Sequence, residues 1–262
     1  MNPSKDGIDF IIVSYYKPDF IKLLVKSIRK FVNHPYLITI IANETLESKE
    51  YLDLLKTYKS EEDINIIPGT GQVSFKERGG MAGVKWETDE FGNKFGPGSI
   101  NHSKGLTLGM KNTNQKYICF LDNDTVFLNE WVEDILPMLE EAFLVSHRMD
   151  KNKGPQGIIR EMFMIFKRKE FEKYNLYPNC EYVDSAGNIT KCIIDNQEEV
   201  IILENSLWNP SLKKRHILNL RGGEQAFIGD KPFFYHYGRG ASRGDDYYNE
   251  WIVEVTKILE NK

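Results

Sequence analysis

The chain has 262 residues, of which 41% are hydrophobic and 27% charged, and its formal net charge is −4. This length fits one large α/β domain with a sizeable core. The slightly acidic balance does not indicate a nucleic-acid-binding protein, and no run approaches the roughly 20 apolar residues that span a bilayer.

The first quarter of the chain alternates between strand and helix patterns. Ile8–Ser14 is an apolar run typical of a buried parallel strand, and Pro18 then opens a helix. A second strand is predicted at residues 37–42, a second helix after Ser48, and a third strand at 64–67. This alternation predicts a parallel sheet with helices on its faces.

A glycine-rich stretch, residues 68–99, interrupts the alternation and predicts a long loop or hairpin. The pattern then resumes with a helix, a strand, a longer helix and a strand, predicted at residues 101–111, 116–121, 129–140 and 142–146. Pro137 is expected to disturb the end of the longer helix, because proline lacks the amide hydrogen that a helix interior needs.

The second half is less regular. We predict a strand, a short helix, a further strand and a closing amphipathic helix at residues 163–166, 168–174, 233–237 and 246–259. Residues 180–192 predict a β-hairpin that turns near Ala186, Gly187 and Asn188.

The three cysteines, Cys119, Cys180 and Cys192, form no CxxC pair. The polar N-terminus does not resemble a signal peptide. We therefore expect reduced thiols and a cytoplasmic protein. A bridge between Cys180 and Cys192 across the predicted hairpin is the alternative.

Two carboxylates one residue apart follow the strand predicted at 116–121. Asp122 and Asp124 flank Asn123, and ligands collect at the carboxyl ends of strands in open α/β sheets. Neighbouring carboxylates repel each other unless a cation or hydrogen bonds compensate, and Mg²⁺ or Mn²⁺ suits them. The alternative is a solvated turn. The apolar residues on both sides favour the metal site.

A histidine occupies the end of a later strand. His236 ends an apolar run and precedes a segment rich in glycine and arginine, which includes Arg239 and Arg243. Neutral imidazole is a frequent metal ligand, and arginines bind phosphates. The alternative is a half-buried histidine that bonds a backbone carbonyl. Its neighbours favour a role as a third metal ligand.

These segments resemble family 2 and related glycosyltransferases of the GT-A fold. The similarity lies in IDFIIVSYYKPDFIKLLVKSI, NHSKGLTLGMKNTNQKYICFLDNDTVF, EMFMIFKRKEF and YHYGRGASR. The resemblance implies an α/β fold with a mostly parallel central sheet and a DxD metal motif. It further implies nucleotide-sugar contacts at Val13, Ser14, Tyr15, Asn43, Lys104, Asp122, Asn123, Arg239 and Ser242, and metal contacts at Asp122, Asp124 and His236.

The chain departs from the family pattern in two places. His102, Ser103 and Lys104 stand where the family commonly has an arginine–asparagine pair. A catalytic carboxylate has no clear equivalent. Glu224, in RGGEQ, resembles a Gly-Gly-Glu element of some inverting transferases and is the candidate base, with rivals at Asp195, Glu198 and Glu204.

Together these features predict a single GT-A domain over residues 1–262, with a nucleotide-binding half at 1–127 and an acceptor-side half at 128–262. The predicted activity is metal-dependent sugar transfer from a UDP- or GDP-sugar to a glycan, lipid-linked or small-molecule acceptor, with inversion. Peripheral membrane contact is compatible with this function. The alternatives are a retaining transferase, a nucleotidyltransferase, which lacks its glycine-rich loop here, and a non-catalytic glycan- or nucleotide-binding protein.

Overall fold

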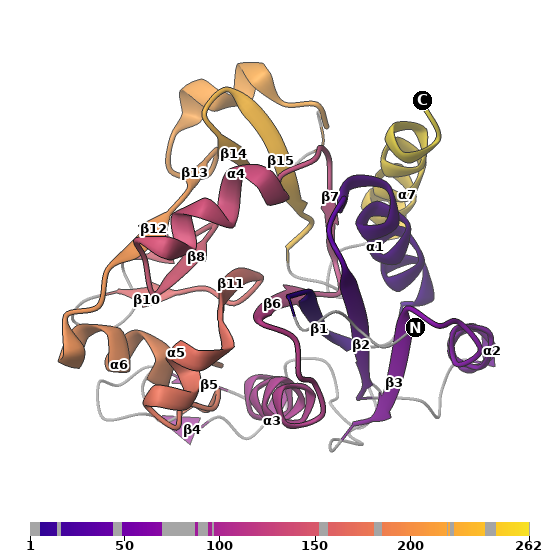
Figure 1. The fold of residues 1–262 in the computed structure, drawn as a ribbon. Coiled ribbons are helices and arrows are strands. Elements are labelled where there is room, and N and C mark those ends of the chain that lie inside the picture. Colours follow the sequence, from indigo (N-terminus) through magenta and orange to yellow (C-terminus); the bar gives the residue numbers. More distant parts are fainter. Residues whose placement is uncertain are drawn as a thin grey trace.

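A computed structural model describes residues 6–14, 17–43, 49–69, 87–88, 94–95, 97–151, 157–180, 185–218, 220, 223–238 and 245–261. Seven strands form the larger sheet, in the order β12-β8-β11-β6-β1-β2-β3. Their bounds are Val200–Ile202, Leu144–Ser146, Phe163–Lys167, Tyr117–Asp122, Ile8–Ser14, Tyr36–Ala42 and Ile64–Pro68. β6, β1, β2 and β3 run parallel, whereas β11 runs antiparallel to both its neighbours. The predicted mostly parallel α/β sheet is confirmed (Figure 1).

Helices cover both faces of this sheet, because alternate residues of β1 point to opposite sides. Phe10 and Ile12 pack with α1 (Pro18–Phe31) and α2 (Lys49–Tyr58). Ile11 and Val13 pack on the other face with α3 (Pro97–Lys111) and α6 (Gly187–Asn196). α5 (Arg168–Lys173) adds Phe171 to this second layer.

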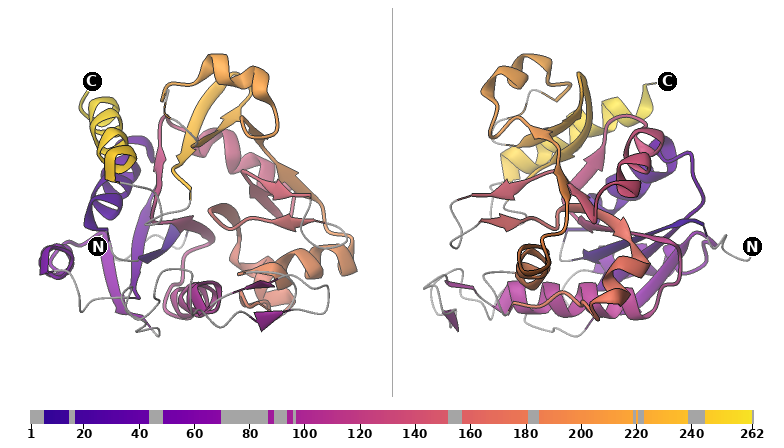
Figure 2. Two further views of the ribbon diagram at one scale, coloured as in Figure 1. Left: turned by 180° about the vertical axis from the view of Figure 1, so that it is seen from behind. Right: turned by 60° about the vertical axis from the view of Figure 1, so that its left-hand side comes forward.

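A smaller antiparallel sheet stands against the larger one, in the order β13-β14-β15-β7. Its strands are Glu204–Asn205, Glu224–Ile228, Lys231–His236 and Thr125–Phe127. β7 follows β6 after a two-residue turn, so one chain segment links the two sheets. The closing helix α7 (Asp245–Glu260) lies along α1, as Figure 2 shows, and buries Trp251 and Val255 there.

The remaining elements are short. They are β4 (Glu87–Thr88), β5 (Lys94–Phe95), α4 (Val132–Ile135), the 3₁₀ helix η1 (Pro137–Glu140), β9 (Met149–Asp150), β10 (Ile158–Ile159) and the 3₁₀ helix η2 (Pro210–Arg215). Most of the loop predicted at 68–99 lies outside the described residues. α3 begins at Pro97, earlier than predicted, since proline fits the first turn of a helix.

Two predicted elements are wrong. Residues 187–196 form helix α6 instead of one arm of a hairpin. Ala186 does turn the chain, with φ of 59°, but Ile189, Thr190 and Ile193 then bury one helical face. The helix predicted at 129–140 is instead α4 followed by η1, because Pro137 cannot donate the hydrogen bond that would continue the helix.

Candidate functional site

The carboxyl ends of three parallel strands meet at one edge of the large sheet. Val13 in β1 is the register partner of Asp122 in β6, and Ser14 is the partner of Ala42 in β2. The Asn43 amide donates to the Ser14 carbonyl at 3.1 Å. The structure therefore brings the strand ends predicted to contact a nucleotide to the same edge as Asp122, which is where α/β sheets bind ligands.

Asp124 and His236 come together through the pairing of β7 with β15. Thr125, directly after the acidic turn, is the register partner of His236. The Tyr237 amide donates to the Asp124 carbonyl at 2.9 Å, which fixes the end of β15 against the turn. His236 Nε2 then lies 3.5 Å from Asp124 Oδ1 and 3.9 Å from Asp122 Oδ2.

These three side chains fit a divalent cation. One ligand atom from each of Asp122, Asp124 and His236 lies within 4.8 Å of the other two. Two carboxylate oxygens and one imidazole nitrogen are ligands that Mn²⁺ accepts, and the oxygens also suit Mg²⁺. Asp124 and His236 are 4% and 6% exposed, and such crowded, buried carboxylates need a compensating positive charge.

The pKa values of the group reflect this crowding. Burial raises the pKa of Asp122 to about 6; His102 opposes the rise, and the charges of Asp124 and Glu161 add to it. Burial alone would lower the pKa of His236, but the charge of Asp124 and the bonds to Asp124 and Glu224 raise it to about 10. The cluster thus attracts a cation electrostatically.

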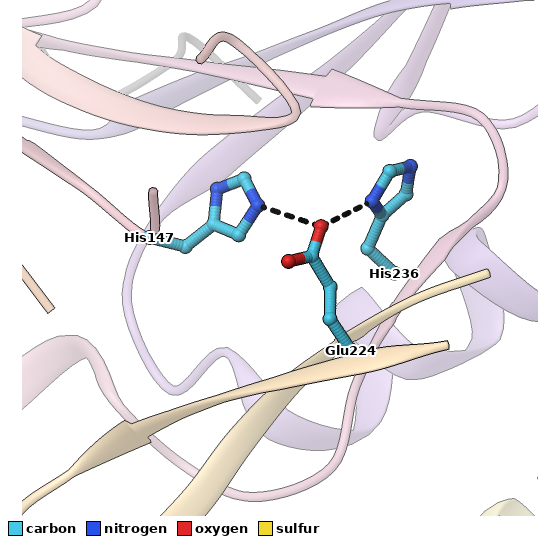
Figure 3. A group of neighbouring side chains, drawn as sticks. All are labelled: His147, Glu224 and His236. Carbon is cyan, nitrogen blue, oxygen red and sulfur yellow. Dashed lines mark hydrogen bonds and ion pairs between the residues drawn. The ribbon is translucent and has the colours of Figure 1, made fainter. Parts of the chain in front are cut away.

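The Glu224 carboxylate lies between the imidazole rings of His147 and His236 (Figure 3). Its Oε1 lies 2.8 Å from His236 Nδ1, accepts a bond from Arg148 Nη1 at 2.9 Å, and is 3.6 Å from His147 Nε2. Burial raises its pKa, but the bonds and charges of the two histidines hold the pKa well below its usual range. A carboxylate held ionised by these partners is a weak general base, and its position is one from which it can orient His236; the catalytic role of Glu224 stays a prediction.

Helix α3 presents His102, and not Lys104, to the acidic cluster. His102 Nε2 is 3.3 Å from Asp122 Oδ1, and His102 Nδ1 is 3.5 Å from Glu161 Oε1. Lys104 lies in a groove with Tyr177 instead. Residues two apart on a helix point about 200° apart, so His102 and Lys104 face different surroundings; the phosphate contact of Lys104 stays a prediction.

Sequence reasoning missed Glu161 and His147. Glu161 is 3% exposed, lies just before β11, and accepts a bond from Ser185. His147 follows β8 directly and is fully buried. Glu161 follows Arg160, and His147 lies between Ser146 and Arg148. The signal that could have found them is that each borders a buried strand at the edge of the sheet where β6 ends.

The remaining predicted contacts are placed as follows. Val13 packs against Gly105 of α3, and the Tyr51 hydroxyl donates to Ser14 Oγ at 2.6 Å, so both strand-end side chains face the core. Asn43 Nδ2 donates to the Asn101 carbonyl at 3.2 Å. Asn123 is half-buried in the acidic turn. Tyr15, Arg239 and Ser242 lie outside the described residues.

Comparisons with known proteins agree with this architecture. Residues 97–194 match the model of glycosyl transferase family 2. The chain is similar to Staphylococcus aureus TarS 1-349, with 10% identity and a TM-score of 0.51 over 98% of this chain and 66% of that one. TarS 1-349 in complex with UDP-GlcNAc aligns with 11% identity and a TM-score of 0.50, over 98% and 67%.

The glycosyltransferase GlyE of Streptococcus pneumoniae TIGR4 aligns with 13% identity and a TM-score of 0.50, over 98% of this chain and 62% of GlyE. The chain thus spans about two thirds of these proteins. No curated protein matches it. Among the helices that the structure describes, none has the length and hydropathy that a membrane span requires.

Proposed function

From its GT-A fold of the family 2 type, we propose that the chain transfers a sugar from a nucleotide-sugar donor to an acceptor hydroxyl. The observation that carries the proposal is the meeting of Asp122, Asp124 and His236 at the carboxyl edge of the large sheet. This edge is where a nucleotide binds in open α/β folds. The acidic turn lies inside the segment that matches the family model.

Asp122, Asp124 and His236 would hold Mn²⁺ or Mg²⁺. Such an ion, when bound, neutralises the charge that develops on a nucleoside diphosphate leaving group. Glu224 keeps the His236 ring oriented through its bond to Nδ1, which leaves Nε2 toward the two aspartates. His102 orients Asp122 from the other side.

A UDP-sugar is the first donor to test, since the similar protein TarS 1-349 has been solved in complex with UDP-GlcNAc, and a GDP-sugar is the second. A glycan, a lipid-linked sugar or a small molecule is the proposed acceptor. Tyr15, Arg239 and Ser242 remain predicted donor contacts. A cytoplasmic location is part of the proposal, supported by three free cysteines.

Inversion remains the predicted outcome, but the position of Glu224 favours the retaining alternative as a second candidate. An inverting transferase needs a carboxylate base near the acceptor, and Glu224 is committed to His236, Arg148 and His147. Proton NMR of the product identifies the anomer directly and decides between the two.

The metal assignment is tested with Asp124→Asn, which removes a ligand charge with little change in shape. Calorimetric titration with UDP in the presence of Mn²⁺ is expected to show that the affinity for UDP falls more than about 100-fold. This exceeds the loss of about 10- to 100-fold that follows when a residue supporting a metal ligand is changed, because Asp124 is itself a proposed ligand. Asp195→Asn, at an exposed aspartate of α6 paired with Lys191, is the matched control and should bind as the wild type does. Equal binding by both variants would remove the basis for the site.

Donor turnover separates an enzyme from a binding protein with the same fold. A transferase slowly hydrolyses its nucleotide-sugar without acceptor, and release of the nucleoside diphosphate (UDP from a UDP-sugar, GDP from a GDP-sugar) reports this. Wild-type protein that binds UDP with Mn²⁺ but releases no nucleoside diphosphate from any UDP- or GDP-sugar would support the non-catalytic alternative.

A further inference from the structure

One surface segment exposes an unusual share of large apolar side chains. Leu207, Trp208 and Ile217 are 49%, 49% and 45% exposed, and they lie in the connection between β13 and β14. Elsewhere in the described part of the chain, exposed large hydrophobic residues are Tyr177 and Val253. Apolar residues scattered singly on a surface are ordinary, but a group within one short segment marks an interaction site.

The segment, residues 206–217, is closed at its base by Gln225. The Ser206 amide donates to the Gln225 carbonyl at 3.0 Å, and the Ile217 amide donates to Gln225 Oε1 at 3.1 Å. Gln225 Nε2 donates to the Leu218 carbonyl at 2.8 Å. Since one buried residue binds both ends, Leu207 and Ile217 lie close together, and the segment forms a compact loop of a kind that is frequently functional.

The backbone of the loop is fixed, so Trp208 is exposed by the fold. Asn205 Oδ1 accepts the Leu207 amide at 2.8 Å, and the Asn205 carbonyl accepts the amides of Trp208 and Asn209. Leu212 is 3% exposed and anchors the loop from inside. The chain thus buries one leucine of the loop and holds its tryptophan in solvent.

A cationic run accompanies these apolar side chains. Lys213, Lys214 and Arg215 are all exposed and end η2. With about three residues per turn and Leu212 inward, Lys213 and Lys214 point away from the core. Arg215 pairs with Asp230, which is highly exposed and lies outside the loop. Glu204 lies in β13, before the loop begins. The loop therefore keeps a net positive charge.

We propose that the loop 206–217 docks on the surface of an anionic lipid bilayer. Tryptophan prefers the interface between water and lipid, where Leu207 and Ile217 would enter the acyl boundary. Lys213 and Lys214 would lie among anionic headgroups. A protein partner is less favoured, because lysine is depleted from protein interfaces. In Figure 1 the loop (orange) lies at the top of the small sheet, at the opposite end of the molecule from α3.

Vesicle co-sedimentation of the full chain tests the proposal, with phosphatidylcholine alone compared with phosphatidylcholine containing about one third phosphatidylglycerol. We expect binding to the anionic vesicles that weakens with salt. Each of Lys213→Gln and Lys214→Gln should reduce the partition coefficient about fivefold, the effect of one surface charge. Lys56→Gln and Lys59→Gln, at exposed lysines of α2 and its end, should leave it unchanged.

Brominated lipids test the apolar contact. They should quench the fluorescence of a Trp86→Phe protein on vesicles but not that of the Trp86→Phe, Trp208→Phe double variant, since the two remaining tryptophans, Trp131 and Trp251, are buried at 1% and 0% exposure. Val253→Ser is the control for an exposed apolar residue elsewhere. No binding to anionic vesicles, or equal losses in the control variants, overturns the proposal. A Trp208-dependent dimer without vesicle binding assigns the loop to a second copy. Donor hydrolysis in solution does not depend on the loop, so it tests the proposed function separately.

Discussion

Glu224 is expected to control the affinity of the metal site without being a ligand. Its carboxylate bonds His236 at 2.8 Å and Arg148 at 2.9 Å from a position that is 5% exposed. Glu224→Ala removes these bonds and leaves His236 with one ring nitrogen unsatisfied in the interior. Loss of one partner of a buried ion pair costs roughly 3–5 kcal/mol. Arg148 also bonds Asp150, so we expect about 3 kcal/mol, the lower end of that range.

For a chain of this size, about 3 kcal/mol corresponds to a fall in Tm of roughly 6–12 °C, measurable by differential scanning calorimetry. Mn²⁺ affinity, measured by electron paramagnetic resonance, should fall about 10- to 100-fold because the imidazole is no longer oriented. Glu224→Gln keeps an oxygen that accepts from His236 Nδ1, so it should restore most of the affinity while still losing stability. A folded Glu224→Ala protein with wild-type Mn²⁺ affinity would refute this account.

Four further variants test the rest of the site and the packing around it. His102→Ala should weaken Mn²⁺-dependent UDP binding about tenfold, measured by calorimetry, because His102 contacts Asp122. Lys104→Ala should leave this binding unchanged, because Lys104 lies in the groove with Tyr177. A larger loss of affinity in Lys104→Ala than in His102→Ala would instead support Lys104 as a phosphate contact. Ser14→Ala should lower the free energy of unfolding, measured in urea, by about 1 kcal/mol, since it removes the hydrogen bond that the buried Tyr51 hydroxyl donates to Ser14, and UDP affinity should be unchanged. Gly109→Ala should cost about 1–2 kcal/mol, because the new Cβ would lie 2.4 Å from an isoleucine of β1 and this clash outweighs the gain in helix propensity; a more stable variant would contradict the packing described for α3.

The first half of the fold could be predicted because its strands are buried on both faces. Such strands are continuous apolar runs, and β1 was predicted to the residue. The local sequence pattern could not predict why Asp9, a charged residue within this apolar run, is fully buried. Asp9 accepts bonds from the Gln115 amide at 2.7 Å and from Arg168 at 2.8 Å, partners more than 100 residues away in sequence. Its role depends on contacts that only the folded chain provides.

The candidate site was predictable in the same uneven way. Asp122 and Asp124 are one residue apart at the end of an apolar strand, so the local sequence pattern found them. His147 and Glu161 stand in other segments of the chain, and they join the site only because β11 lies beside β6 and β8 lies beside β11 in the sheet. Glu224 was found as a residue, but its contacts with His236 and Arg148 could not be predicted, because they depend on which side chains surround it in the folded chain.

The position of His236 depends on the register between the two sheets. β7 begins directly after Asp124, and its pairing with β15 places Thr125 opposite His236. A shift of one residue in this pairing would turn His236 to the other face of the small sheet, because side chains alternate along a strand. The imidazole would then point away from both aspartates. The Tyr237 amide bonded to the Asp124 carbonyl secures the register at this end, and the buried Phe127 and Phe234, also register partners, secure it at the other. The aromatic core that joins the sheets therefore also determines whether the three metal-binding side chains converge.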